Sequence, residues 1–334
     1  MLEYAPSAPQ WLGDYMSCID AEILDLFGGN GSALHSAATD SLSKGKRVRA
    51  ILALLWCEAI SSDYKTAIPV AVAYELAHAS ALVQDDIIDH SEMRRGEKSI
   101  VSKYGLPEAI LAANMLLSFV PGKISQYATS SGEMIQKLFE LLGESYGASV
   151  WGEYLDLEMS RRESVTEKDY ESMIRSKTGA LVGASSASGA IVGGGLNLNG
   201  IVDSAFRFGE LIGMAYQVKD DLLDVTSNEG VLGKPAFADI RRGKKNIVLL
   251  HSLKSCSAPD QQFLVSLLGR NEAYGEEEIG KARDLFDASG SISYAHKIAL
   301  RYTDEAQKIL DIVDNIAIRR RLLELSDYLS QRKY

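Results

Sequence analysis

The sequence predicts an all-α fold. Long apolar segments recur at helical spacing along most of the 334 residues, and no two alternating segments flank a hairpin turn. Only seven prolines interrupt the chain, mostly between these segments, where proline can begin a helix without breaking one. We therefore expect helices nearly throughout.

The predicted helices follow one another along the chain. Residues 49–60 are apolar and rich in alanine and leucine, and residues 69–89 and 107–119 each begin with proline, which suits a first helical turn. Residues 133–162 place Leu138, Leu142 and Tyr146 at four-residue intervals, on one face of a helix. Further helices are expected over residues 205–225, 276–288 and 295–329.

Residues 179–202 carry no charge and are long enough to span a bilayer. Glycine, serine and alanine dominate this segment, which also contains Asn197 and Asn199. We therefore expect an interior helix that ends at the glycines of residues 193–195, and no transmembrane segment. The first eleven residues lack a basic region followed by an apolar core, so no signal peptide is expected.

Composition narrows the class of protein. A formal net charge of −10 argues against nucleic acid as a partner. Cys18, Cys57 and Cys256 are widely spaced and odd in number, so we expect buried thiols in a cytoplasmic protein and no disulfide framework. No composition shift or long linker divides the chain, which predicts a single domain over residues 1–334.

Two DDxxD clusters, at residues 85–89 and 220–224, each follow a strongly apolar segment. Residues four apart share a helix face, so Asp85 and Asp89 point the same way, as do Asp220 and Asp224. Mg²⁺ supplies the counter-charge that such pairs need, because it prefers carboxylate oxygens and shares its remaining positions with phosphates. Two clusters therefore predict magnesium sites that hold a diphosphate. A calcium-binding EF-hand is excluded, because neither cluster has that loop's glycine and terminal glutamate.

Basic motifs accompany both clusters. They are GKRVR at residues 45–49, RRG at 94–96, KTG at 177–179, GKP at 233–235 and RRGKK at 241–245. Arginine suits bidentate contacts with phosphate, and lysine acts as a point charge. Acid clusters that alternate with basic motifs indicate a polyanionic substrate bridged by metal.

In this order the motifs resemble those of the trans-isoprenyl diphosphate synthases, the head-to-tail polyprenyl synthetase family. The resemblance runs from Gly45 to about Lys245 through GKRVR, His-x(6)-DDxxD-x(4)-RRG, KTG, Q-x-x-DDxxD and GKP. It implies a single-domain bundle of about ten or more core helices around a deep central cavity, the isoprenoid synthase fold. It also implies a homodimer.

The resemblance assigns metal and reaction roles to matching positions. Asp85 and Asp89 would bind two Mg²⁺ ions on the allylic diphosphate, and Asp220 would bind a third, with Asp224 nearby. Thr178 and Gln217 would line the reacting carbons, where an oxygen dipole can stabilise a carbocation. About three ions per active site are therefore expected.

The resemblance also divides the basic residues between two diphosphates. Those expected to hold the allylic diphosphate are Arg94, Lys177 and Lys234, and those expected to hold isopentenyl diphosphate are Lys46, Arg49, His78 and Arg95. Lys244, Arg332 and Lys333 would close over the site. A lone histidine on an apolar helix is more often a core residue. His78, however, lies seven residues before Asp85, two turns back on the same face, which favours binding.

The implied reaction is head-to-tail condensation of isopentenyl diphosphate with an allylic diphosphate through an allylic carbocation. One alternative is a terpene cyclase-like enzyme, which has no need of a second diphosphate site. Another is a non-catalytic regulatory subunit, which usually loses part of one aspartate cluster. Both clusters are intact here.

Small residues before the first cluster predict a product longer than farnesyl, with geranylgeranyl first and geranylfarnesyl or longer next. Ser80, Ala81 and Ala77 lie beneath Asp85 on the expected helix and leave room for a growing chain, although alanine stripes also serve close helix packing. The floor must then come from another helix. The candidates are Met115, Phe119, Phe139 and Tyr146.

Three departures from the family pattern concern the product and subgroup but not the reaction. Gln84 stands where many relatives have histidine, and Ala113-Asn114 where many long-chain relatives have Gly-Asp. Glu153, three residues before Asp156, stands where glutamine is frequent.

Overall fold

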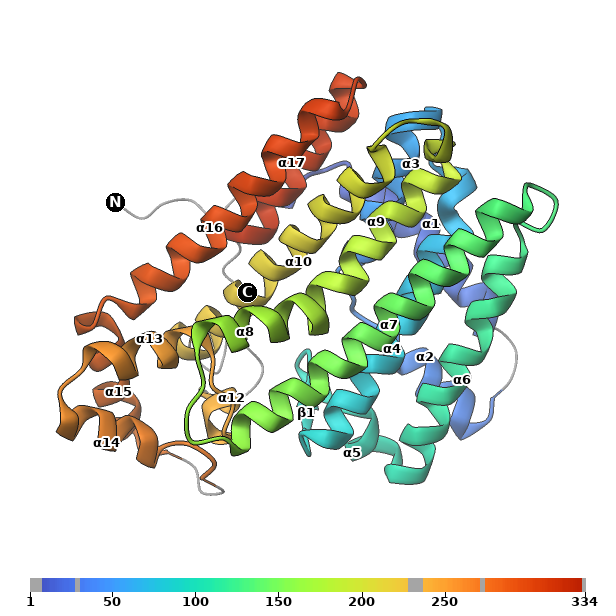
Figure 1. Ribbon diagram of the computed structural model, residues 1–334. Helices are drawn as coiled ribbons and strands as arrows, with labels where there is room; N and C mark the ends of the chain where they lie inside the picture. Colours follow the sequence, from blue (N-terminus) through green and yellow to red (C-terminus); the bar gives the residue numbers. More distant parts are fainter. Residues whose placement is uncertain (1–7, 28–30, 228–236, 271–273, 332–334) are drawn as a thin grey trace.

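The computed structural model of the chain describes residues 8–27, 31–227, 237–270 and 274–331. Helices dominate these ranges, as the sequence predicts (Figure 1). The α-helices are α1 (Leu12–Phe27), α2 (Ala33–Ser41), α3 (Val48–Ser61), α4 (Ile68–Ile88), α5 (Ile100–Tyr104), α6 (Leu106–Ser125), α7 (Gly132–Arg161), α8 (Glu167–Ile174), α9 (Ala180–Val192), α10 (Ile201–Thr226), α12 (Ala238–Arg241), α13 (Ile247–Ser255), α14 (Ala258–Ser266), α15 (Glu276–Ala288), α16 (Ser291–Ile309) and α17 (Ile316–Gln331).

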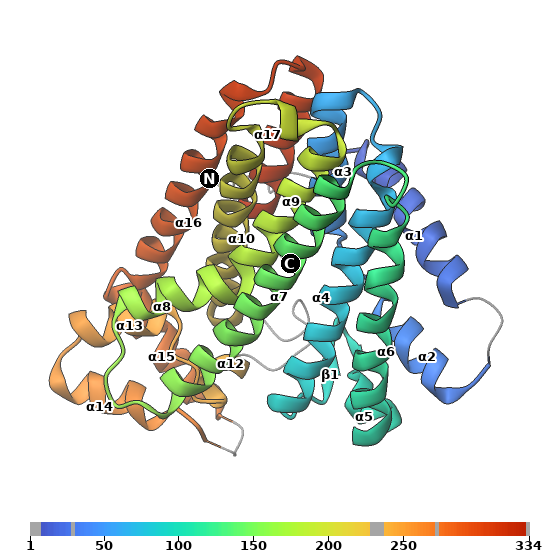
Figure 2. The ribbon, with the colours of Figure 1, turned by 45° about the vertical axis from the view of Figure 1, so that its right-hand side comes forward.

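Long helices lie side by side through the middle of the molecule (Figures 1 and 2). Helix α9 packs against α3, α7 and α10, while α6 covers α4 and α16 covers α10. The α3–α9 contact is close, because a Cβ on Gly189 would lie only 2.0 Å from the carbonyl oxygen of Ala53. Small residues therefore let the central helices approach one another.

The uncharged segment is the interior helix that the sequence predicts. Helix α9 is buried along most of its length and ends at Val192, after which Gly194 adopts a φ of 101°. Within the described ranges, one helical segment, Lys65–Ile88, is apolar and long enough to cross a membrane. Two-thirds of its most apolar stretch is buried against the rest of the protein, as befits a core helix.

The prediction of one helix over residues 295–329 is wrong. Helix α16 ends at Ile309, a 3-10 turn follows over Leu310–Ile312, and α17 begins at Ile316. Asn315 starts the second helix, because its Oδ1 accepts a hydrogen bond from the backbone N–H of Ile318, at 3.3 Å. A side chain that caps a new helix in this way competes with continuation of the old one.

Among the residues that the structure describes, a short hairpin is the only β-structure. Strands β1 (Met93–Arg94) and β2 (Glu97–Lys98) pair antiparallel around Arg95 and Gly96. Both turn residues have positive φ, 54° and 77°, as a two-residue type I′ turn requires. The RRG motif therefore forms a tight turn, and the defined backbone of this turn fixes the positions from which Arg94 and Arg95 extend.

Candidate active site

The predicted motifs that lie within the described residues meet in one cavity of about 480 Å³. Its walls come from α4, α7, α10, the hairpin and η2, a π-helical segment (Arg175–Gly179) between α8 and α9. The predicted site residues that line it are Lys46, Arg49, His78, Ala81, Asp85, Asp89, Arg94, Arg95, Lys177, Thr178, Gln217, Asp220 and Lys244. Residues nearly 200 positions apart thus share a single site.

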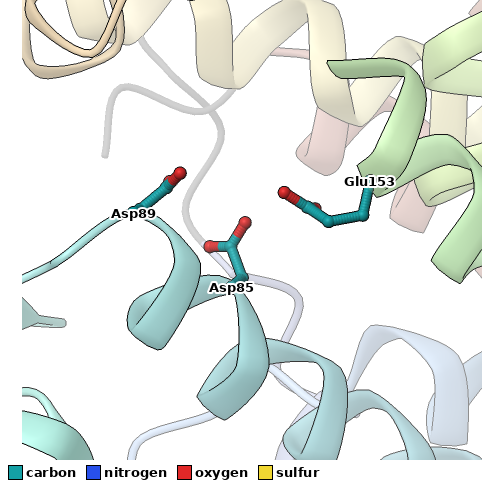
Figure 3. A group of neighbouring side chains, drawn as sticks. All are labelled: Asp85, Asp89 and Glu153. Atoms are coloured by element: carbon teal, nitrogen blue, oxygen red, sulfur yellow. The ribbon is translucent and has the colours of Figure 1, made fainter. Parts of the chain in front are cut away.

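The first aspartate cluster faces a glutamate on a neighbouring helix. Asp85 and Asp89 at the end of α4 point toward Glu153 on α7 (Figure 3). One carboxylate oxygen from each residue lies within 4.8 Å of the other two. Three carboxylates that converge in this way can hold a divalent cation.

Lys177 joins the two sides of this acidic group. Its Nζ lies 2.8 Å from Asp156, 2.7 Å from Glu153 and 3.4 Å from Asp85. Burial by itself would lower the pKa of Lys177, but the three carboxylates, with Asp85 first, outweigh it and hold the pKa well above its usual value. The lysine therefore stays charged.

Close packing places Lys177 beside α7. A Cβ on Gly152 would lie 2.2 Å from the backbone nitrogen of Lys177, so only glycine permits this approach. The Ser149 hydroxyl also donates to the carbonyl of Lys177, at 2.9 Å. The π-helical turn carries Lys177 and Thr178, and such turns are frequent at functional sites.

Other cations hold the remaining carboxylates of the first cluster. Arg94 pairs with Asp85 and with buried Asp86, both at 2.6 Å. Lys244 lies 2.7 Å from Asp89 and 3.4 Å from Asp156. Burial would raise the pKa of Asp85, but Lys177, Lys244 and Arg94 outweigh it and hold that pKa well below its usual range.

The two acids at the start of the second cluster have different surroundings. Both Asp220 and Asp221 line the cavity, and Asp221 also accepts hydrogen bonds from Tyr170 on α8, at 2.5 Å, and from the amide of Gln217, at 3.1 Å. Burial raises the pKa of Asp221 to about 8. Gln217 Oε1 in turn accepts from the Thr178 hydroxyl, at 2.8 Å, which fixes the orientation of its amide.

Asp224, the predicted partner of Asp220, does not line the cavity. It is fully buried behind it, where its Oδ2 accepts a hydrogen bond from the backbone N–H of Asp239, at 3.2 Å. Its role as a metal ligand stays a prediction.

A second basic group lines the cavity beside the hairpin. Arg95 donates to the carbonyl of Ser43, at 2.7 Å, and Nε of Arg49 is buried without a hydrogen-bond partner among the described residues. Burial, reinforced by Arg49 and Arg95, lowers the pKa of His78 well below its usual value, so the ring is neutral at pH 7. A buried cation with a spare donor is suited to an anionic ligand.

The small residues of α4 occupy different positions. Ala81 lines the cavity, whereas Ser80 and Ala77 are buried beside it. The Ser80 hydroxyl lies 3.4 Å from the hydroxyl of Tyr146, one of the predicted floor residues. Of the other candidates, Phe139 is 40% exposed, Phe119 packs on Phe27, and Met115 is partly buried against the core.

Sequence reasoning noted Glu153 and Asp156 but assigned them no role, and it missed Tyr170. The signal for the two acids was their three-residue spacing on α7, which puts both on one helix face. Nothing in the sequence pointed to Tyr170, which reaches Asp221 across 51 positions. Lys234, Arg332 and Lys333 lie outside the described residues.

Comparisons with known proteins define the class. The family model for polyprenyl synthetase matches residues 32–286, so the chain belongs to the polyprenyl synthetase family. It is a prenyltransferase that elongates trans-prenyl chains, on the all-α isoprenoid synthase fold.

Individual relatives agree with this class. The chain is 35% identical to the short chain isoprenyl diphosphate synthase of Methanothermobacter thermautotrophicus over 290 residues, 87% of either chain. It is 33% identical to the geranylgeranyl pyrophosphate synthase of Geoglobus acetivorans over 302 residues, 90% of this chain and 91% of that one. The crystal structure of geranylgeranyl pyrophosphate synthetase from Pyrococcus horikoshii superposes with a TM-score of 0.88 at 32% identity, covering 96% of this chain and 97% of that one.

Proposed function

We propose that this enzyme condenses isopentenyl diphosphate with an allylic diphosphate and releases a trans-prenyl diphosphate longer than farnesyl, with geranylgeranyl diphosphate favoured. One observation carries the proposal. A single cavity is lined by aspartates from both clusters and, beside them, by a separate basic group made of Lys46, Arg49, His78 and Arg95. A terpene cyclase needs one diphosphate site, whereas a condensing enzyme needs two.

The residues fit magnesium. Asp85, Asp89 and Asp220 present carboxylate oxygens to the cavity, the ligands that Mg²⁺ prefers. About three ions bound there would neutralise the charge that develops on the leaving diphosphate. Arg94 and Lys177, which pair with Asp85 in this structure, would turn to the allylic diphosphate, and Lys234 of the GKP motif is the third cation predicted to bind it.

Thr178 and Gln217 support the reacting carbons. Because the Thr178 hydroxyl donates its hydrogen to Gln217, its lone pairs remain available to an electron-poor carbon in the cavity. A fixed oxygen dipole stabilises positive charge without reorganisation. The isopentenyl double bond would attack the allylic cation, and a proton would then leave to the released diphosphate.

The floor of the chain channel is best assigned to Tyr74. This residue lies seven positions before Ala81 on α4, two turns below it on the same face, and it is fully buried. Its hydroxyl lies 3.0 Å from that of Ser188 on α9. We propose that a chain passing Ala81 and Ala77 ends against this side chain, which favours a product longer than farnesyl.

We further propose a homodimer through α6 and α7. Large apolar side chains are exposed on these helices, namely Leu106, Ile110, Leu111, Phe139, Val150, Trp151 and Tyr154. Phe139, Val150 and Tyr154 on α7 recur at intervals of eleven and four residues, along one face, and the ring of Trp151 lies beside that of Tyr154. A second copy of the chain would bury that face.

The continuous core from Leu12 to Leu329 supports one domain over residues 1–334, and the widely spaced thiols support a cytoplasmic location.

The test uses purified protein with Mg²⁺, radiolabelled isopentenyl diphosphate and, in separate reactions, dimethylallyl, geranyl, farnesyl or geranylgeranyl diphosphate. Products are dephosphorylated and separated by chain length. We expect incorporation of isopentenyl diphosphate and a product of twenty carbons or more. Consumption of an allylic diphosphate without isopentenyl diphosphate would instead indicate a cyclase.

A further inference from the structure

Glu153 reaches the first aspartate cluster from another helix. Asp85 and Asp89 come from α4, while Glu153 extends from α7, and its carboxylate points into the space between them (Figure 3). Oε2 of Glu153 is paired with Lys177, at 2.7 Å. Oε1 is buried and has no hydrogen-bond partner among the residues that the structure describes.

The position of the Glu153 carboxylate is not explained by its ion pair with Lys177 alone. A buried carboxylate oxygen without a donor costs free energy, so such oxygens normally face a donor, water or a cation. Asp156 offers a comparison, because it also contacts Lys177 and in addition contacts Lys244, but it is not part of the convergent group of three. Glu153 therefore combines an unused ligand atom with a position beside two other acids.

The spacing of the three acids suits one ion. Two oxygens on opposite sides of an octahedral Mg²⁺ ion lie about 4.2 Å apart, given bonds of about 2.1 Å. The ligand atoms of Asp85, Asp89 and Glu153 lie within 4.8 Å of one another. A small rotation of a carboxylate about its side-chain bonds closes that difference.

We propose that Glu153 is the third protein ligand of a divalent ion held by Asp85 and Asp89. This rests on the proposed function, in which those aspartates bind magnesium. Magnesium sites for phosphate substrates usually use one or two carboxylates and leave the rest of the shell to water and substrate. With three carboxylates, this enzyme binds one ion before any diphosphate arrives, and Lys177 shifts from Glu153 to the substrate.

The experiment titrates the apoprotein with Mn²⁺ in the absence of any diphosphate. Free Mn²⁺ is measured by its electron paramagnetic resonance signal, and water bound to the captured ion by proton relaxation. The variants are Glu153→Gln, which removes the charge but keeps the shape, and Glu153→Asp, which keeps the charge but withdraws it by one methylene. Asp156→Asn is the matched control for loss of a nearby charge, and thermal unfolding without metal checks that each variant folds.

We expect the parent to bind Mn²⁺ on its own and both Glu153 variants to bind at least about tenfold more weakly, because ligand charge and position set affinity. Glu153→Gln gains about one bound water on the ion, whereas Asp156→Asn keeps the parent's water count. The proposal is overturned by Glu153 variants with the parent's affinity and water count, by equal weakening in Asp156→Asn with no change in water, or by a parent that binds no Mn²⁺. Since no substrate is present, these results stand apart from the assay of prenyl transfer.

Discussion

The ammonium of Lys177 lies 3.4 Å from Oδ1 of Asp85, although 92 residues separate them in the chain. One belongs to a π-helical turn and the other to the end of α4. The contact joins a cation expected to hold a diphosphate to a carboxylate expected to hold its metal. In this structure the charges of Lys177 and Asp85 neutralise each other. When a metal–diphosphate complex binds, the metal would replace Lys177 as the partner of Asp85, and the diphosphate would replace Asp85 as the partner of Lys177.

Replacing Asp85 tests the metal site. Asp85→Ala should lower turnover by at least about a hundredfold, because metal stabilisation of charge amounts to several kcal/mol. The measurement is incorporation of isopentenyl diphosphate at saturating Mg²⁺. Asp25→Asn, at an exposed position of α1, is the control and should match the parent. A folded Asp85→Ala enzyme with near-normal turnover would contradict the metal assignment.

Filling the channel should shorten the product. Ala81→Phe places a ring in the cavity beneath the first cluster, so we expect products shorter than the parent's when geranyl or farnesyl diphosphate is the primer. Ser80→Phe should act in the same direction by displacing Tyr146. Ala81→Ser, which adds little volume, should leave the chain length unchanged. Parent-length products from both phenylalanine variants would refute the channel assignment.

The hydrogen bonds from Tyr170 through Asp221 to Gln217 predict coupling between distant side chains. Tyr170→Phe should lower kcat about tenfold with little change in KM, since it loosens the amide that orients Thr178 but leaves the diphosphate cations in place. In a Gln217→Ala background the same change should have almost no further effect, as a double-mutant cycle shows for linked groups. Fully additive losses of kcat would mean that Tyr170 acts independently of Gln217.

His78 should make the apoprotein less stable in mild acid. Burial and nearby arginines lower its folded-state pKa, so below about pH 6.5 the unfolded chain takes up a proton that the folded chain does not. The free energy of unfolding therefore decreases as the pH is lowered, by at most about 1.4 kcal/mol per pH unit from this group. Urea unfolding of the parent and of His78→Gln between pH 7.5 and 5 isolates the contribution. Parallel curves for the two proteins would exclude it.

The apolar face of α7 predicts the oligomeric state. Trp151 and Tyr154 are 57% and 50% exposed and their ring centroids lie 5.1 Å apart, so a charge at Trp151 should disfavour burial against a second copy. We expect the parent to elute as a dimer in light-scattering chromatography and Trp151→Glu to shift toward monomer. Lys137→Glu, at an exposed position of the same helix, is the control. A monomeric parent would refute the proposed interface.

Local sequence patterns were sufficient for most helices. Ranges such as 276–288 agree with the structure at both ends, because helical periodicity and a following turn are local properties. The break between α16 and α17 was missed because Asn315 acts as a cap only when the chain turns there. The pairing of β1 with β2 was missed because each strand has only two residues, too short for an alternating pattern.

The sequence alone determined the chemistry, because the motifs consist of the residue types that metal and diphosphate require, and their order resembles one family. Only the tertiary structure decided which of them share a cavity. It buried Asp224 outside the lining of the cavity, and it packed the hydroxyl of Tyr74 against that of Ser188 on α9. It also brought Glu153 to Asp85 and Asp89 across two helices. Spacing along a chain orders side chains within one helix, but the distance between helices depends on packing, and here Gly152 and Gly189 set that distance.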